Sequence, residues 1–196
     1  MLIGSLDTAE SKINNMGLFS SNRVTRKNII ESLSGFFDTG YKSLSQGLIQ
    51  VFEGKIEINN EQKKELMVVA MLAVTEATSK TWGKLAEEKE LVGKKPREIM
   101  LKQYFSNAEE FERFEELFNK RSKEYHEVLQ PENTELALQF GQIFCTHFLD
   151  KDKISDLEID SKNTAIMMFV GMMFIKQMTG VKKFFDEIMA KCVFDW

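Results

Sequence analysis

Long segments of this chain repeat apolar residues at the three-and-four spacing of one helical face. The first of these segments begins near Asn28 and keeps the spacing for about seven turns. Only two prolines occur in 196 residues, and proline is the residue that most firmly interrupts a helix. The sequence therefore predicts an all-α protein.

Composition and length predict one globular unit. The apolar share of 43% and the charged share of 29% are close to those of ordinary globular proteins. A chain of this length can bury a full hydrophobic core without metals or disulfides. We expect a flexible or partner-packed N-terminal arm over residues 1–24 and a single-domain helical bundle of about six to eight helices over residues 25–196.

Capping residues, glycines and prolines predict where the helices begin and end. Thr25 can cap a first helix, which runs to Phe52 and is either continuous or broken near Gly40. The further helices expected are one from Glu61 to about Glu90, a short one from Pro96, a surface helix opened by a capping box of Ser106 and Glu109, one from about Glu132 to Leu149, one from Ser161 to Thr179 closed by Gly180, and a final one from Val181 to about Cys192.

Two apolar runs predict the centre of the core. Leu66–Val74 contains no polar side chain, so its helix is expected to be buried all round. The four methionines of Ala165–Ile175 either fill the core or line an adaptable groove for a ligand or partner. The residues expected to be mostly buried are Val69, Met71, Leu72, Phe169, Val170 and Met172.

The same two runs align at an offset of 101 residues, Leu66 falling on Met167. A real duplication would give two related helical hairpins. The alternative is that two buried helices match by composition alone.

No motif for catalysis, cofactor binding or metal binding is complete. The connector Asp150–Ser161 has the twelve-residue length of an EF-hand loop. Its fifth, sixth and twelfth positions are Ile154, Ser155 and Ser161, where calcium binding needs an oxygen ligand, a glycine and a glutamate. No phosphate-binding loop, nucleophile elbow or zinc-binding histidine pair occurs. We therefore expect a protein that is not an enzyme, with no catalytic, cofactor-binding or metal-binding residues and no cofactor.

The histidines and cysteines are few and isolated. His126 and His147 are the only histidines, so a three-histidine metal site within one chain is impossible. Cys145 and Cys192 suggest neither a CxxC pair nor a disulfide framework, which fits a reducing cytosol. The N-terminal residues show no secretion signal, and the apolar run Ala165–Ile175 is shorter than the roughly 20 residues that span a bilayer. We expect a cytoplasmic protein without a transmembrane segment.

Residues 26–49, RKNIIESLSGFFDTGYKSLSQGLI, carry an aromatic pair and then a Gly-Tyr pair. This segment, about an eighth of the chain, resembles the opening of TetR-type regulators. The resemblance implies a DNA-binding transcriptional regulator with a compact three-helix head and exposed Arg23, Arg26 and Lys27. This is the alternative to a helical bundle, in which one continuous helix runs through Gly40.

Beyond Gly54 the chain departs from the TetR pattern. Lys55 and Ile56 stand in place of a small turn, and Glu61 stands in place of an aromatic residue. The formal net charge of −4 and the pI near 5.4 also argue against a nucleic-acid-binding face as the dominant surface.

By exclusion, we expect a non-enzymatic binding or assembly protein that engages a protein partner or an apolar ligand. Val193, Phe194 and Trp196 follow the final helix and are expected to bind a partner or to support self-association. The alternative is that they pack onto the chain's own bundle. The N-terminal arm combines apolar and basic residues, as segments at anionic membrane surfaces do, but it is too short to anchor the protein, so no membrane contact is expected.

Overall fold

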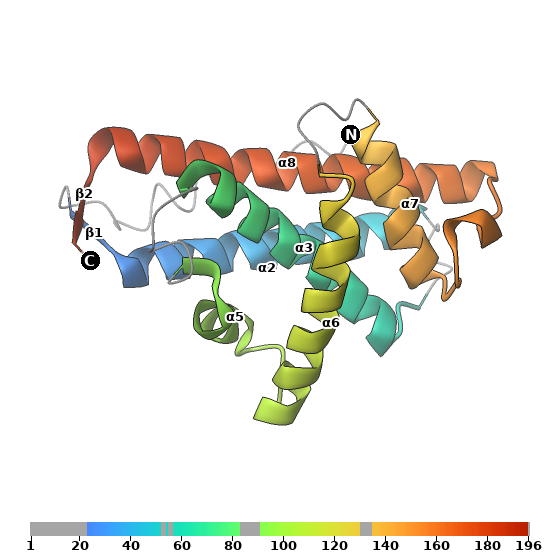
Figure 1. Ribbon diagram of the computed structural model, residues 1–196, viewed down its shortest axis with the longest axis horizontal. Helices are drawn as coiled ribbons and strands as arrows, with labels where there is room; N and C mark the ends of the chain where they lie inside the picture. The colour runs from blue at the N-terminus through green and yellow to red at the C-terminus, as the bar shows by residue number, and fades with distance from the viewer. Residues whose placement is uncertain (1–22, 52–53, 55–56, 83–90, 130–134, 196) are drawn as a thin grey trace.

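The computed structural model describes residues 23–51, 54, 57–82, 91–129 and 135–195, which contain six α-helices and one short parallel strand pair (Figure 1). The predicted all-α helical bundle is confirmed. The elements in chain order are β1 (Arg23–Thr25), α2 (Arg26–Val51), α3 (Asn60–Trp82), α5 (Lys94–Leu101), α6 (Ala108–His126), α7 (Leu136–Phe148), a 3₁₀ turn (Ile154–Asp156), α8 (Ser161–Lys191) and β2 (Val193–Asp195).

The two longest helices lie along the long axis of the molecule (Figure 1). β1, which leads into α2, pairs with β2, which follows α8, and Val24 lies opposite Phe194. The start of α2 and the end of α8 therefore lie together, and the two helices run in opposite directions. α3 packs against both of them, α7 packs against α8 and α3, and α5 packs against α2.

Side-chain caps begin α2, α3, α6 and α8. The backbone N–H of Asn28 donates to Thr25 Oγ1 at 3.2 Å, as the sequence predicts. Asn59 and Gln62 cap α3 reciprocally, each backbone N–H donating to the other's side chain at 3.0 and 2.9 Å. Asp160 accepts from the backbone N–H of Asn163 and begins α8.

The predicted capping box at Ser106 and Glu109 is wrong by one residue. The N-cap of α6 is Asn107, whose Oδ1 accepts the backbone N–H of Glu110 at 2.9 Å. Glu110 in turn accepts the backbone N–H of Ser106 at 2.8 Å. Serine and asparagine both cap well, so the sequence alone did not separate the two positions.

The core is centred on α3. Every residue of Leu66–Val74 is at most 5% exposed, so the prediction of a helix buried all round is confirmed. The prediction for α8 was partly wrong. Val170 is fully buried, but Phe169 is half-buried and Met172 is 55% exposed. The two aligned apolar runs therefore differ in burial, since only one face of α8 meets the bundle.

The predicted end of a helix at Gly180 is also wrong, because α8 continues to Lys191. The buried positions Gln177, Val181, Phe184 and Ile188 keep the three-and-four spacing across the glycine. Burying three large apolar side chains contributes several kcal/mol, which exceeds the cost of about 1 kcal/mol for a glycine inside a helix.

α2 runs without a break through Gly40. The helical-bundle interpretation predicts this continuous helix. It contradicts the compact three-helix head implied by the resemblance to TetR-type regulators. Arg23, Arg26 and Lys27 are exposed, as both alternatives permit. Residues 23 and 24, assigned to the N-terminal arm, belong to β1, and the rest of that arm lies outside the described residues.

Candidate functional site

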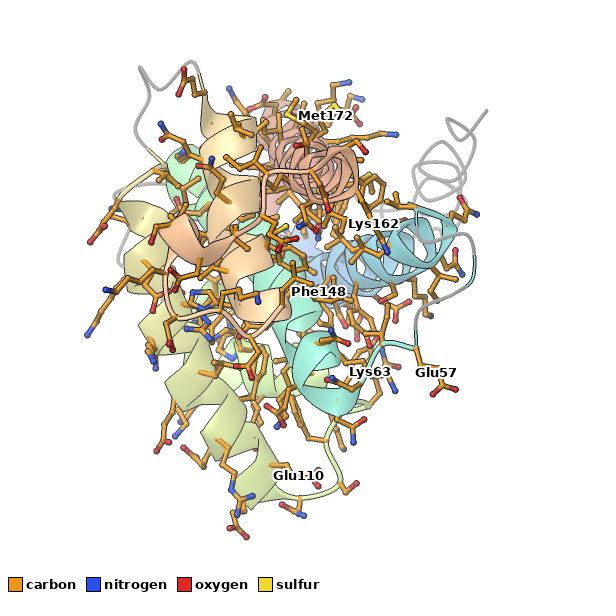
Figure 2. The ribbon with its side chains drawn as sticks, turned by 90° about the vertical axis from the view of Figure 1, so that its right-hand side faces the viewer. Glu57, Lys63, Glu110, Phe148, Lys162 and Met172 are labelled. Atoms are coloured by element: carbon orange, nitrogen blue, oxygen red, sulfur yellow. The ribbon has the colours of Figure 1, made fainter. Side chains whose placement is uncertain are left out.

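One helix presents a line of apolar side chains to solvent. On α8, Ala165, Met168, Met172 and Ile175 recur at the spacing of one helical face. Met168 is 38% and Met172 is 55% exposed, while Ala165 is exposed and Ile175 is half-buried. Figure 2 shows Met172 on the outer side of α8, away from α2 and α3. We call these four residues the α8 ridge.

The buried face of α8 fixes the orientation of the ridge. Val170 and Phe174 are fully buried, and Gln177 is 4% exposed. With about 100° between successive residues, this buried line lies on the opposite side of the helix from Met168 and Met172. The burial of one face therefore presents the methionines to solvent.

Two glycines bring α7 and α8 into close contact along one flank of α8, beside the ridge. Gly141 of α7 lies against the backbone of Met167, and Gly171 of α8 lies against the backbone of Ala137. In neither place is there room for a Cβ atom. Small residues at a crossing allow helix axes to approach closely, so α7 packs tightly against the helix that carries the ridge.

The two ends of the α8 ridge carry opposite charge. Residues 150–160, which precede the ridge, hold five carboxylates and two lysines. Asp156, Glu158 and Asp160 are exposed among them. Beyond the other end lie three exposed lysines, Lys176, Lys182 and Lys183, and then the exposed Asp186, Glu187 and Lys191. Within the described residues, none of these three lysines forms an ion pair with the chain itself.

A second group of polar side chains ties α6 to α3 and α7. Arg121 Nη2 lies 2.8 Å and Nε 3.0 Å from Glu65 Oε1, and these side chains are 12% and 8% exposed. Arg121 Nη1 also lies 3.4 Å from Glu124, whose carboxylate contacts Nε2 of His147. The group joins three helices through bonds among its own members, which is the arrangement of a structural network.

A buried ion pair joins α5 to α6 in the same way. Arg97 donates through Nε and Nη2 to the two carboxylate oxygens of Glu115, at 2.8 and 2.6 Å. Its Nη1 donates to the carbonyl of Val92, and the guanidinium lies 4.7 Å from the centre of the Phe118 ring. Each of the three guanidinium nitrogens of Arg97 thus has a partner within the chain, which is the arrangement of a structural ion pair.

A cleft of about 530 Å³ lies between α5 and α6. Its lining residues are Glu98, Ile99, Leu101, Lys102, Phe105, Ser106, Asn107, Ala108 and Phe111. Asn107 and Glu110 already accept backbone N–H groups at the start of α6, which removes donors that an anion would need. The cleft therefore presents mixed polar and apolar side chains without a convergent set of donors.

No metal or thiol chemistry emerges from the described part of the chain. Within it, no group of three or more His, Cys, Asp or Glu side chains could hold a metal ion. Burial raises the pKa of the Cys145 thiol to about 12, so this cysteine stays protonated at neutral pH. His147 contacts Glu124 rather than Cys145.

The structure places only the backbone of the predicted partner-binding tail. Val193 and Phe194 lie in β2, opposite Arg23 and Val24 of β1, and Trp196 lies outside the described residues. The assignment of the three side chains to partner binding stays a prediction. At the level of the backbone, the tail pairs with its own chain.

By length and composition alone, one described helix, α8, could cross a membrane. The buried core helix of a soluble protein passes the same test, and α8 contacts α2, α3 and α7 along its length. α8 also carries Lys176, Thr179 and Lys183 on the same side as Met172.

The prediction that Met172 is buried was wrong, although the sequence contains a sign of its exposure. Lys176, Thr179 and Lys183 follow Met172 at four, seven and eleven residues, and thus share its face of the helix. Polar residues in phase with Met172 indicate a solvent-facing side.

The chain matches no protein-family model, no curated protein and no solved structure.

Proposed function

We propose that this chain is a non-enzymatic helical-bundle protein that binds or assembles with a protein partner through the α8 ridge. The observation that carries the proposal is the exposure of Met168 and Met172, at 38% and 55%, within the apolar run Ala165–Ile175. Contiguous apolar groups on the surface of a folded protein mark interaction sites more often than isolated ones do.

The residue types of the ridge suit a protein surface as partner. Methionine is flexible and polarizable, so it adapts to the shape of the surface that covers it. The positions 165, 168, 172 and 175 repeat the spacing by which one helix lays its apolar face along another. A partner that supplies a helix face would bury the exposed methionines.

A protein partner fits the ridge better than a small apolar ligand does. Ligand sites are concave and enclose most of the ligand's surface, whereas the outer face of one helix is convex. The cleft between α5 and α6 is concave, but Glu98, Lys102 and Ser106 contribute to its lining and α8 does not. We therefore propose that the methionines of the ridge contact a protein and not a small apolar ligand.

Site-directed photo-crosslinking in cells that naturally contain the protein tests the proposal. A benzophenone amino acid replaces Met172 in the full chain, and a second variant carries it at Glu116, which is exposed on α6 and serves as a matched control. We expect protein adducts, to another protein or to a second copy, at position 172 and none at 116. Equal adducts at both positions, or none at 172, would contradict the proposal.

A further inference from the structure

We infer that the occupant of the α8 ridge is a second copy of this chain, docked through its own α8 ridge with the two helices antiparallel. The inference rests on the proposed function, because it names the partner of the same surface. It is carried by the distribution of charge around the ridge and by the order of side-chain sizes along it.

Charge selects the antiparallel orientation. Residues 150–162, before the end of the ridge near Ala165, carry a formal net charge of −2 even with Lys162 included, and residues 176–191, beyond Ile175, carry +2 even with Asp186 and Glu187 included. Two antiparallel copies place the acidic end of each against the basic end of the other. A parallel pair would place like charges together, which is unfavourable. A two-fold interface of this kind is complementary to itself and closes as a dimer.

Side-chain size selects the register. When Met168 lies opposite the partner's Met172, the antiparallel helices also place Ala165 opposite the partner's Ile175. A small side chain then faces a large one at each end of the apolar line, and flexible methionines meet at its centre. This alternation is the pattern by which facing side chains fill an interface.

The same register brings the charged groups within reach. At about 1.5 Å per residue, Lys176 lies about 6 Å along the helix from the level of the partner's Met168. The partner's Asp160 lies about 12 Å along the same direction, a gap of about 6 Å that an extended lysine side chain spans. Lys183 lies about 16 Å along the axis, past the start of the partner's α8 at Ser161 and toward the acidic segment 150–160 that precedes it.

The size of the ridge predicts a weak dimer. A stable interface buries about 800 Å² on each partner, and one face of a single helix over about three turns offers less than that. We expect reversible association that depends on protein concentration, with each copy folded on its own.

A membrane surface is the less favoured occupant of the ridge. The exposed carboxylates of Asp156, Glu158 and Asp160 lie at one end of the ridge and would repel anionic lipid. Lys183 and Asp186 continue the same helix face with charged groups. A second copy of the chain, whose charges complement both ends of the ridge, is therefore favoured over a membrane surface.

Charge reversal in the full-length protein tests the orientation and the partner together. Sedimentation velocity in reducing buffer measures the dimer fraction over a range of concentrations. We expect Lys183→Glu and Glu158→Lys each to lower the apparent association constant at least five-fold, and the double variant to restore it, since the exchanged charges again face each other. Both positions are exposed, so circular dichroism should show unchanged folding in all three variants. Met172→Glu should abolish the dimer.

Three results would overturn the inference. The first is a wild-type protein that stays monomeric at all concentrations, and the second is a double variant that associates no better than the single ones. The third is that the wild-type protein cosediments with vesicles of anionic lipid whereas the Met172→Glu variant does not. This result would identify a membrane as the occupant. A monomer whose position 172 still crosslinks to a different protein would leave the proposed function standing, whereas a monomer without adducts would end both.

Discussion

Gly40 of α2 lies against the side-chain amide of Gln177 in α8, with no room for a Cβ atom between them. The Nε2 atom of Gln177 donates to the carbonyl oxygens of Phe36 at 3.2 Å and Ala70 at 3.1 Å. One buried amide thus joins α8 to α2 and α3. A glycine at position 40 leaves the space through which this polar group reaches its two acceptors.

Gly40→Ala is expected to destabilise the protein by about 1 to 3 kcal/mol, because the added methyl group must displace the Gln177 amide from its hydrogen bonds. Gly35→Ala is the matched control in the same helix, since a Cβ there meets nothing within 4 Å. The control should be neutral or stabilising by up to about 1 kcal/mol, as alanine is the better helix former. Chemical denaturation measures both, and equal effects would show that the contact with Gln177 is unimportant.

Gly171→Ala is expected to cost about 3 kcal/mol, because its Cβ would meet backbone atoms of Ala137, which cannot move aside as a side chain can. Gly180→Ala in the same helix is the control, since its nearest neighbour is Phe36 Cε1 at an ordinary 3.7 Å. The two thermal midpoints should move in opposite directions. A Gly171→Ala variant as stable as the control would show that α7 and α8 do not pack backbone against backbone.

Gly40 and Gly180 show why the helical periodicity predicted the fold class better than the helix boundaries. Periodic apolar positions reveal which residues meet the core, and this part of the prediction held for α2 and α3. In the sequence, a glycine that ends a helix looks the same as a glycine inside a helix that leaves room for a side chain of another helix. At Gly40 the reason is a side chain of α8, more than 130 residues away, and no local pattern contains that contact.

The α8 ridge was hidden for a related reason. Ala165–Ile175 is apolar on all sides, so periodicity within the run cannot tell its buried face from its exposed face. Only the phase of Lys176, Thr179 and Lys183 beyond the run distinguishes the two. The reciprocal glycine contacts with α7 depend on tertiary packing and leave no sign in the sequence.

Tyr125→Phe is expected to raise the stability of the protein by up to about 1 kcal/mol, because the hydroxyl is fully buried and makes no hydrogen bond within the described residues. Burial raises the pKa of this phenol well above its ordinary value, so it is neutral. Tyr104→Phe is the control, since the Tyr104 hydroxyl donates to Asp38, and should lower stability by about 1 kcal/mol. A loss of stability in Tyr125→Phe would reveal a partner for the hydroxyl.

Removal of residues 193–196 is expected to lower the melting temperature by a few degrees, since 1 kcal/mol corresponds to about 2 to 4 °C in a domain of this size. The truncation deletes β2, the strand that pairs with β1 at the start of α2. Calorimetry and light scattering should show this loss at unchanged molecular mass. A lower mass at an unchanged melting temperature would instead assign Val193, Phe194 and Trp196 to an interface.

Arg121→Met is expected to destabilise the protein by about 3 to 5 kcal/mol, because it leaves the carboxylate of Glu65 buried without its counter-ion. Adding Glu65→Met should recover most of the loss, as two apolar side chains then replace the buried pair. Lys94→Met is the surface control, because its ion pair with Glu112 is 54% exposed on both sides, and it should produce no measurable change. Urea denaturation of the four variants, including Glu65→Met alone, gives the coupling between Arg121 and Glu65. If the double variant were as unstable as Arg121→Met, the cost would lie in lost packing around α6 and not in an unpaired buried charge.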